Sequence, residues 1–398
     1  MAIKSPSDLV TLQVAGQNFA GWQDVQIVRG VELFPSYFSL KLTERLPGAP
    51  KSLAIDPGQT CRVMIGPDLV LTGYVDSYES RISARGHEVT VIGRSGTQDL
   101  VDCAAGITPA GDPVQPAMTF SAPTLLKLAQ DLCAPFGITV TEPDGEGAPL
   151  VSFGNGGIPA FTMPLGATVY DYLEPKARIR QMLMLDGRDG NLILAKLGTK
   201  KAASGFTLPG NVLEAQVRFS KQDRFTIYLP VAHPFDNFRE LVGPNGRSAN
   251  SYAPVPDAAA FKGQIRLDGK PRYRPHFVIS DQPFPGSSLA EQLAKWEKGR
   301  RYGRSQAVTA LVPLWRDSAG KLWEANTLAQ VDMPALKFPA CTWLISQVTF
   351  LKGEAGTRTA VTLMPPEAFQ PDPTFDTSFD PQITQAFEQS RANQKGSI

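Results

Sequence analysis

Three histidines are the first candidates for acid–base or metal chemistry, because histidine titrates near neutral pH and often binds metals. They are His87, His233 and His276. None lies in an H-E-x-x-H or comparable metal-binding pattern. His87 is followed directly by Glu88, and adjacent residues of a strand point to opposite faces. We interpret the three histidines as structural residues, with a catalytic or metal-binding role as the alternative.

The cysteines show no metal-site spacing. Zinc sites usually use close pairs of ligands, whereas the four cysteines of this sequence are scattered along the chain. We interpret them as small apolar side chains in a reducing compartment. They are Cys61, Cys103, Cys133 and Cys341.

Two glycine-rich segments have the residue types of catalytic or phosphate-binding loops. Gly93-Arg94-Ser95-Gly96 is similar to a nucleophile elbow, but that motif needs a second glycine at position 97, which is threonine. Gly154-Asn155-Gly156-Gly157 is followed by neither Lys-Ser/Thr nor the start of a helix, as a phosphate loop requires. We expect the first segment to end a strand at a turn and the second to be an exposed loop.

Paired carboxylates could support glycoside hydrolysis or bind a cation. Asp99 and Asp102 are three residues apart, and Asp186 and Asp189 lie in an Asp-Gly-Arg-Asp-Gly run. We interpret the first pair as solvated or capping groups and the second as turn residues, with too few ligands for a calcium loop. We therefore predict no catalytic, cofactor-binding or metal-binding residue, no cofactor and no enzymatic activity.

A basic cluster lies near the end of a predicted helix. Its members are Lys298, Arg300, Arg301 and Arg304. Cations suit the carboxyl end of a helix dipole, so a structural role ranks first, a subunit interface second and nucleic acid third. The chain has 39 Lys and Arg against 38 Asp and Glu, which argues against a dedicated nucleic-acid binder.

Length and composition indicate several folded domains. A chain of 398 residues exceeds one ordinary core, so we expect two to four domains. The sequence contains no apolar stretch near the roughly 18 residues of a membrane span, and its first residues lack the apolar segment of a secretory signal. We expect assembly in the cytoplasm and no membrane partner. The 35 glycines and 34 prolines predict many turns between short strands.

Alternating apolar residues predict a first antiparallel β-barrel over residues 1–98. Val10, Leu12 and Val14 show this period, and similar runs recur between Gly/Pro turns. Residues 99–203 change to a small α/β domain. We expect one helix capped by Ser121 and a second that starts at Thr168, with Asp171 as its capping partner.

The helix starting at Thr168 contains Pro175, which should kink or end it. Further β patterns predict a second barrel from residues 204–230 and 306–366. We expect it to be interrupted by a loop-rich insertion, 231–305, that ends in a helix capped by Ser288 with Glu291 as partner. A flexible or docking tail, 367–398, follows. The expected fold is mainly β with α+β parts: two similar antiparallel β-barrels, a small mixed α/β domain and an insertion domain.

Several segments, in order from about residue 5 to 370, resemble Mu-like phage baseplate hub proteins. The most recognisable stretch is Trp315-Arg316-Asp317-Ser318 with Gly320-Lys321-Leu322-Trp323-Glu324-Ala325-Asn326-Thr327. The others are Gly93 to Cys103, Gly190 to Leu194, Arg272 to Pro275, Val348 to Phe350, Thr359 to Leu363 and Pro366 to Phe369.

The resemblance implies a structural hub in the baseplate of a virion's contractile tail. It implies a homotrimeric ring whose six barrels match a sixfold tube while its three subunits match a threefold spike, with DNA passing through and without catalytic residues. The expected partners are further copies of the chain, the central spike protein, the tail tube or tube-initiator protein and other baseplate proteins, with no specific nucleic-acid binding. Alternatives are the hub of a related bacterial contractile injection particle and a tail-associated cell-wall hydrolase.

Overall fold

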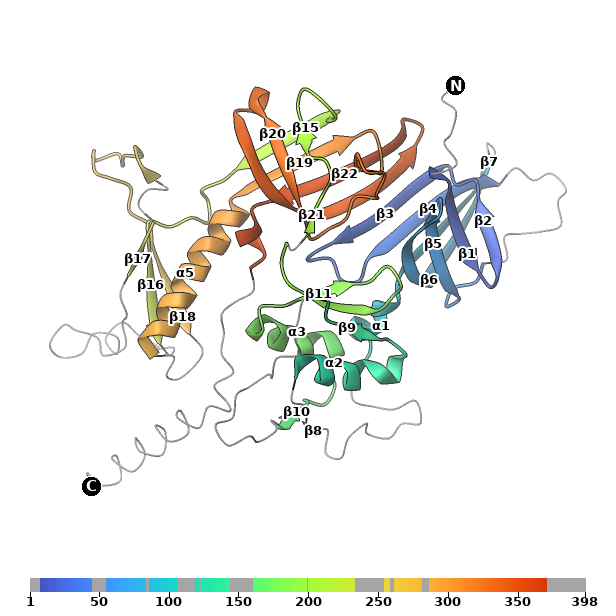
Figure 1. The fold of residues 1–398 in the computed structure, drawn as a ribbon, viewed down its shortest axis with the longest axis horizontal. Helices are drawn as coiled ribbons and strands as arrows, with labels where there is room; N and C mark the ends of the chain where they lie inside the picture. Colours follow the sequence, from blue (N-terminus) through green and yellow to red (C-terminus); the bar gives the residue numbers. More distant parts are fainter. Residues whose placement is uncertain are drawn as a thin grey trace.

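A computed structural model shows two β units side by side, a small α/β domain beneath them, and a long helix packed on a separate sheet (Figure 1). The structure describes residues 8–44, 55–83, 86–105, 119–121, 124–143, 160–198, 200–232, 254–257, 261–280 and 286–370. The mainly β fold predicted from the alternating patterns is confirmed.

The first β unit consists of seven strands that pair antiparallel in the order β3-β4-β7-β6-β5-β1-β2. The strands are β1 (Val10–Val14), β2 (Gln17–Ala20), β3 (Asp24–Gly30), β4 (Tyr37–Glu44), β5 (Thr60–Ile65), β6 (Asp68–Ser83) and β7 (Gly86–Ser95). Val10, Leu12 and Val14 are all buried, because alternate residues of a strand face the same side.

The second β unit lies beside the first and has five main strands. They are β15 (Glu214–Phe219), β19 (Gln306–Val312), β20 (Thr327–Met333), β21 (Phe338–Gly353) and β22 (Gly356–Met364). The 3-10 helix η6 (Pro334–Leu336) connects β20 to β21. Two short strands, β13 (Lys200–Lys201) and β14 (Phe206–Thr207), pair parallel with β20.

Five strands of the first unit recur in the second with the same pairing order. β3-β4-β7-β6-β5 corresponds to β15-β19-β22-β21-β20. β6 and β21 are both 16 residues long. Each ladder to the following strand shifts register around one residue, Asp76 in β6 and Ser346 in β21. Each of these residues lies eight positions after the start of its strand, so the two units share topology and the site of a β-bulge.

The two units are joined by direct strand pairing. β3 runs antiparallel to β21, with Val25–Gly30 opposite Gln347–Lys352. The expectation of two separate barrels is therefore wrong in one respect: the described strands of both units form one 14-stranded sheet without a closed barrel. One hydrophobic cluster also runs through both units. The physical reason is that this pairing satisfies backbone groups that separate units would leave at exposed edges.

The α/β domain lies below the sheet in Figure 1 and has its own apolar core. Its elements are η2 (Gly96–Gln98), α1 (Asp99–Asp102), β8 (Thr119–Ser121), α2 (Leu125–Cys133), η4 (Ala134–Phe136), β9 (Val140–Thr141), β10 (Ala160–Thr162), α3 (Val169–Ile179), β11 (Leu183–Asp186) and β12 (Leu192–Ala195). The apolar face of α2 is buried and points into this core.

The first helix start was predicted three residues too early. Ser121 ends β8, and the N-cap of α2 is Thr124, whose Oγ1 accepts a hydrogen bond of 3.1 Å from the Lys127 amide. Serine and threonine are both good N-cap residues, but Ser121 belongs to β8, which pairs with β10, so the helix starts after Thr124.

The start of the second helix is confirmed. Thr168 caps α3, and its Oγ1 accepts a hydrogen bond of 3.0 Å from the Asp171 amide. Of the two outcomes expected at Pro175, a kink or an end, the end does not occur, because α3 continues to Ile179. Leu173 and Ala177, on either side of the proline, are buried in the domain core, and this packing holds the final turn in place.

The insertion contains a small sheet of its own. β16 (Ile227–Ala232) pairs with β17 (Val255–Pro256) and β18 (Pro275–Ser280), and the helix α5 (Gly286–Arg304) packs against it. The expectation that residues 204–230 all belong to the second barrel is therefore wrong, since β16 pairs inside the insertion.

The cap of α5 and the start of the tail also differ from expectation. Ser288 lies inside α5 and not at its start, and Glu291 pairs with Lys295 at 2.7 Å. The 3-10 helix η7 (Pro366–Ala368) packs against α5, so the first residues of the predicted tail are ordered. The rest of that tail, 371–398, lies outside the described residues.

Candidate functional site

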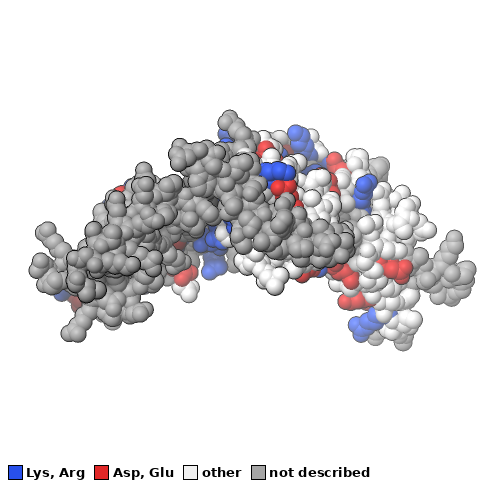
Figure 2. All heavy atoms as spheres, turned by 90° about the horizontal axis from the view of Figure 1, so that it is seen from below, with Lys and Arg blue, Asp and Glu red and all other residues white. Residues whose placement is uncertain are grey.

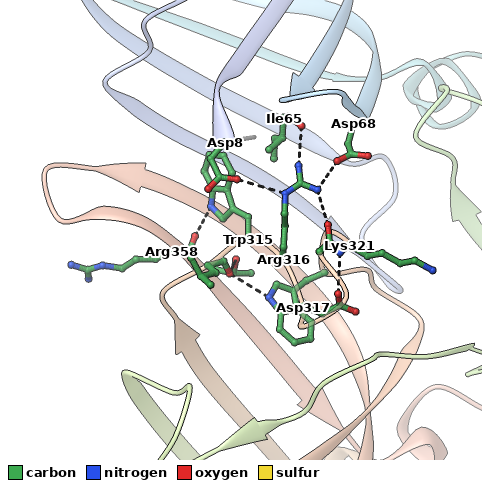
Figure 3. A network of polar contacts seen from close by, with 12 residues as sticks. Asp8, Ile65, Asp68, Trp315, Arg316, Asp317, Lys321 and Arg358 are labelled. Atoms are coloured by element: carbon green, nitrogen blue, oxygen red, sulfur yellow. Dashed lines mark hydrogen bonds and ion pairs between the residues drawn. The ribbon is translucent and has the colours of Figure 1, made fainter. Parts of the chain in front are cut away.

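The residues that hold the two β units together form the first candidate site (Figure 3). Arg316 lies in the loop between β19 and β20, and its Nη1 donates a hydrogen bond of 2.6 Å to Asp68 at the β5–β6 turn. Its Nη2 donates to the Ile65 carbonyl at 3.3 Å, and its Nε lies 3.6 Å from the Asp8 carboxylate. One guanidinium thus joins the second unit to the first. We call these four residues the Arg316 junction.

The loop that carries Arg316 is held rigidly by its neighbours. Trp315 is fully buried, and its Nε1 donates to the carbonyls of Leu351 at 3.1 Å and Arg358 at 2.8 Å. The Asp317 carboxylate accepts from the Lys321 amide at 3.0 Å and closes the turn. The stretch that resembles the hub family most clearly is therefore the connection between the β units.

A buried carboxylate connects the first β unit to the α/β domain. Asp186, at the end of β11, accepts hydrogen bonds from Ser95 Oγ at 2.5 Å and Thr97 Oγ1 at 3.1 Å. It also accepts from the Ser36 amide at 3.2 Å. Arg29 on β3 lies 4.0 Å from the same carboxylate. We call these five residues the Asp186 junction.

Arg29 makes the Asp186 junction a three-way contact. Its Nη2 donates to the Asp186 carbonyl at 2.6 Å, and its Nη1 donates to the Val70 carbonyl on β6 at 2.8 Å. Burial lowers the pKa of this guanidinium, and the negative charge of Asp186 opposes that effect. The side chain links the strand that joins the β units to the α/β domain.

The sequence-based interpretation missed the role of Asp186. It treated Asp186 and Asp189 alike as turn residues, whereas only Asp189 has that role, accepting from the Asn191 amide at 3.2 Å. A signal was present in the pattern of β11: Met184 and Asp186 are its two buried positions, so a carboxylate stands where an apolar residue was expected. Such a residue needs buried partners.

Asn326 is a third connecting residue. Its backbone is left-handed, with φ of +61°. Its side-chain amide donates to the Lys196 carbonyl at 2.9 Å and accepts from the Gly198 amide at 2.8 Å. These bonds tie the segment leaving the α/β domain to the second β unit.

Ser95 and the two nearby aspartates do not form a catalytic arrangement. Ser95 is fully buried and bonded to Asp186. Asp102 pairs with Arg94 at 2.7 Å, and Arg94 also pairs with Asp76 at 2.7 Å, so these charges brace the β6 bulge. Burial raises the pKa of Asp99, with Asp102 as a second cause. Gly154 to Gly157, the other glycine-rich candidate, lie outside the described residues.

Within the described residues, the histidines and cysteines form no group that could hold a metal ion. His87 contacts Ser80 in the β6–β7 hairpin at 2.5 Å, and His276 stacks on Phe225 with ring centroids 4.4 Å apart. His233 lies outside the described residues. Burial raises the pKa of both Cys61 and Cys133 to about 12, which keeps these thiols protonated. Cys103 and Cys341 are partly buried and also unbridged.

Each cation of the basic cluster on α5 has a partner within the chain. Lys298 donates to the Pro256 carbonyl at 2.9 Å, and Arg301 pairs with Glu297 at 2.6 Å. Arg304 pairs with Glu32, which follows β3. Arg300 lies over the Trp296 ring at 5.3 Å. These contacts favour the structural interpretation of the cluster, since they attach α5 to its sheet and to the first β unit.

The described surface mixes both signs of charge. In Figure 2 the basic and acidic side chains are interspersed over the described part of that face. Within the described ranges, no group of three or more His, Cys, Asp or Glu residues is arranged to hold a metal ion. Across those same ranges, no helix has the length and apolar character to cross a membrane. The charged groups of the Arg316 and Asp186 junctions hold structural units together.

Models of phage baseplate families match three segments of the chain. Residues 9–95 match the N-terminal domain of Mu phage baseplate assembly protein GpP-like proteins. Residues 97–196 match the second domain of baseplate hub protein gp44-like proteins. Residues 286–372 match the fourth domain of Mu phage baseplate assembly protein GpP.

Whole-chain comparisons agree with these matches. The baseplate hub protein gp44 of Escherichia phage Mu is 30% identical over 364 residues, which cover 91% of this chain and 89% of gp44. The 43 kDa tail protein of prophage MuSo2 from Shewanella oneidensis has 27% identity and a TM-score of 0.73, covering 91% of this chain and 99% of the other. A tail protein from Neisseria meningitidis MC58 shares the fold at 18% identity and a TM-score of 0.68, covering 92% and 98% of the two chains.

Proposed function

The chain belongs to the family of the phage Mu baseplate hub protein gp44, and we propose that it forms a homotrimeric ring between a sixfold tail tube and a threefold central spike. As a member of this family it is a structural protein of the tail baseplate and not an enzyme. The proposed partners are the spike protein, the tube or tube-initiator protein and other baseplate proteins.

One observation carries this proposal: the pairing order β3-β4-β7-β6-β5 recurs as β15-β19-β22-β21-β20. Three chains, each with two units of the same topology, present six similar units to a sixfold partner. The same three chains present three identical faces to a threefold partner. A ring with these two symmetries meets both neighbours without a separate adaptor.

The two junctions support a ring built from units that are fixed to one another. Arg316 fastens one β unit to the next, and the Asp186 junction fastens the α/β domain to the first unit. The near balance of 39 basic and 38 acidic residues suits a conduit that lets DNA pass without holding it.

We propose a domain organisation that modifies the expected one at two boundaries, the start of the insertion and the start of the tail, which follows η7. A first β unit over 1–98 and an α/β domain over 99–203 are supported by the family matches to 9–95 and 97–196. The second β unit runs from about 204 and is interrupted by the insertion. The pairing of β16 with β18 moves the start of that insertion to before Ile227.

Complementation in the phage or prophage that carries this gene tests the proposal. Deleting the gene should give lysates without complete tails under the electron microscope, and the wild-type gene supplied in trans should restore them. An Asp131→Ala variant, which removes the surface ion pair with Lys127 on α2, should restore tails equally well. Complete tails assembled without this chain would refute the proposal.

A further inference from the structure

Two strand edges have no partner strand within the described chain, although the equivalent edges of the repeat pair with each other. Within the chain, β3 of the first unit pairs with the second half of β21. The counterpart of β3 is β15, which stands at the end of the sheet. The counterpart of β21 is β6, which pairs with β5 only as far as Tyr74. Beyond that residue, on the β5 side, no strand of the described chain continues the ladder.

These two edges cannot meet within one chain. Six strands separate β15 from β6 in the sheet order: β19, β22, β21, β3, β4 and β7. In Figure 1, β15 and the β6–β7 hairpin lie in different halves of the molecule. The edges can pair only between two copies. Each copy would offer one edge of each kind, which is the arrangement of a head-to-tail ring.

The repeat also gives the register of that pairing. Ile27 of β3 lies opposite Phe38, and Phe38 lies opposite Gly93 of β7. In the second unit, Val217 lies opposite Val308, and Val308 lies opposite Leu363 of β22. Gly93 of β7 and Leu363 of β22 are equivalent positions relative to the bulges. The first residue past each bulge pairs with Ile92 in β7 and with Thr362 in β22, and Gly93 and Leu363 directly follow these two partners. Val217 is therefore the counterpart of Ile27.

The partner of Val217 follows by the same comparison. Ile27 pairs with Phe350, which lies four residues after the bulge residue Ser346. The residue four positions after the bulge residue Asp76 is Ser80. The repeat therefore places Val217 of one copy opposite Ser80 of another.

We propose that β15 of one copy pairs antiparallel with the outer half of β6 in a second copy, in the register that sets Val217 opposite Ser80. The proposal rests on the ring described under the proposed function and specifies its subunit interface. The same register sets Arg218 opposite Glu79 and Phe219 opposite Tyr78.

Charges and faces match in this register. Glu79 and Arg218 are both exposed, and neither has an ion-pair partner among the residues the structure describes. Opposite charges directly across an antiparallel pair stabilise it. Tyr78 and Val217 pack against the same hydrophobic cluster, each from its own unit, so they belong to the inward faces of their strands. The register therefore joins inward face to inward face.

The pairing would also cover apolar surface that is exposed in a single chain. Ile82 is 80% exposed and Phe219 is 57% exposed. Ile82 lies on the β6 edge and Phe219 on the β15 edge. The register sets Ile82 opposite Ala215, which is partly buried and packs against the cluster. Long edge strands with exposed apolar side chains favour association with a further strand.

A cysteine pair tests the register directly. In the full chain, Glu79→Cys combined with Arg218→Cys should form a disulfide between copies on mild oxidation, because directly opposed Cβ atoms lie about 4.5–5.5 Å apart. Denaturing gels without reductant should show dimers and a ladder that stops at the closed trimer. The matched control, Glu79→Cys with Glu214→Cys, shifts the register by four residues, or roughly 13 Å, and should give no ladder. Each single-cysteine variant controls for the four native cysteines.

A charge exchange provides a test that needs no oxidation. Glu79→Arg alone and Arg218→Glu alone set like charges opposite one another and should each weaken association by about 2–5-fold per interface. The double variant restores opposite charges and should recover the wild-type association.

The mass of the protein without cross-links shows whether only the register is wrong or the trimeric ring as well. A trimer that gives no ladder, or one that the control pair cross-links equally well, overturns the register and leaves the ring intact. A monomer at all concentrations overturns both the register and the ring. Failure of the double variant to recover association also contradicts the register.

Discussion

Ser95 Oγ donates a hydrogen bond of 2.5 Å to Oδ1 of Asp186, and this bond links the last residue of β7 to the last residue of β11. The two residues are 91 positions apart in the chain and both are buried. The first β unit and the α/β domain therefore meet through a polar contact that excludes water. Removing one partner of such a contact lowers the stability of the fold, because the other partner is left buried without its hydrogen bond.

Replacing Asp186 by alanine should destabilise the protein strongly. The change leaves the buried Arg29 guanidinium without its carboxylate, and loss of one partner of a buried charge pair costs about 3–5 kcal/mol. Thermal and urea unfolding followed by circular dichroism measure this effect. Asp131→Ala is the control, since it removes an exposed ion pair of α2 and should cost less than about 0.5 kcal/mol. Equal effects of the two changes would contradict the role given to Asp186.

Arg316→Ala should loosen the contact between the β units. The side chain loses its hydrogen bonds to Asp68 and the Ile65 carbonyl, and hydrogen bonds of charged groups contribute about 1.5–3 kcal/mol. Arg358→Ala is the control, because among the residues that the structure describes that guanidinium bonds locally, to the Ala355 carbonyl. Hydrogen exchange should increase in β5 and β6 for Arg316→Ala and stay unchanged there for the control. Unchanged exchange in both variants would show that the junction does not hold the units.

The sheet against which α5 packs should lose stability as the pH falls. Burial lowers the pKa of His276, and the nearby Arg301 lowers it further, against an opposing effect of Glu297. The unfolded histidine, with a pKa near 6.5, then binds protons more readily than the folded one. Stability is full above about pH 6.5 and decreases as the pH falls below it. His276→Phe should flatten the melting temperature between pH 7.5 and 5.5, and an unchanged slope would exclude His276 as the cause.

Truncation should separate the ordered start of the C-terminal segment from the rest. A chain ending at Gln370 keeps the buried Phe369 and the 2.7 Å bond from Trp296 Nε1 to the Gln370 carbonyl. Its melting temperature should match that of the full chain, because residues 371–398 contain few aliphatic side chains. A chain ending at Pro365 loses the η7 contact with α5 and should melt several degrees lower. A large loss already at Gln370 would make the segment beyond it a structural strap.

Local patterns in the sequence predicted the elements well and their long-range partners poorly. The buried alternation of β1 and the apolar face of α2 follow from periodicity alone. Cap positions were harder to predict where several capping types lie close together, as with Ser121 and Thr124. The pairing of β3 with β21 joins residues more than 300 positions apart, and no local pattern encodes it. The buried role of Asp186 depends on other long-range contacts, with Ser36, Ser95 and Thr97, which are 89 to 150 positions away in the chain.

The mass of the purified protein in solution tests the central claim most directly. Light scattering coupled to gel filtration should give three times the 43.0 kDa of one chain, because three copies carry the six similar β units that the proposed sixfold partner would require. The mass should stay at that value over a tenfold dilution in the micromolar range, as expected for an obligate ring. A mass of one chain at every concentration, or a stable assembly with any number other than three, would contradict the account.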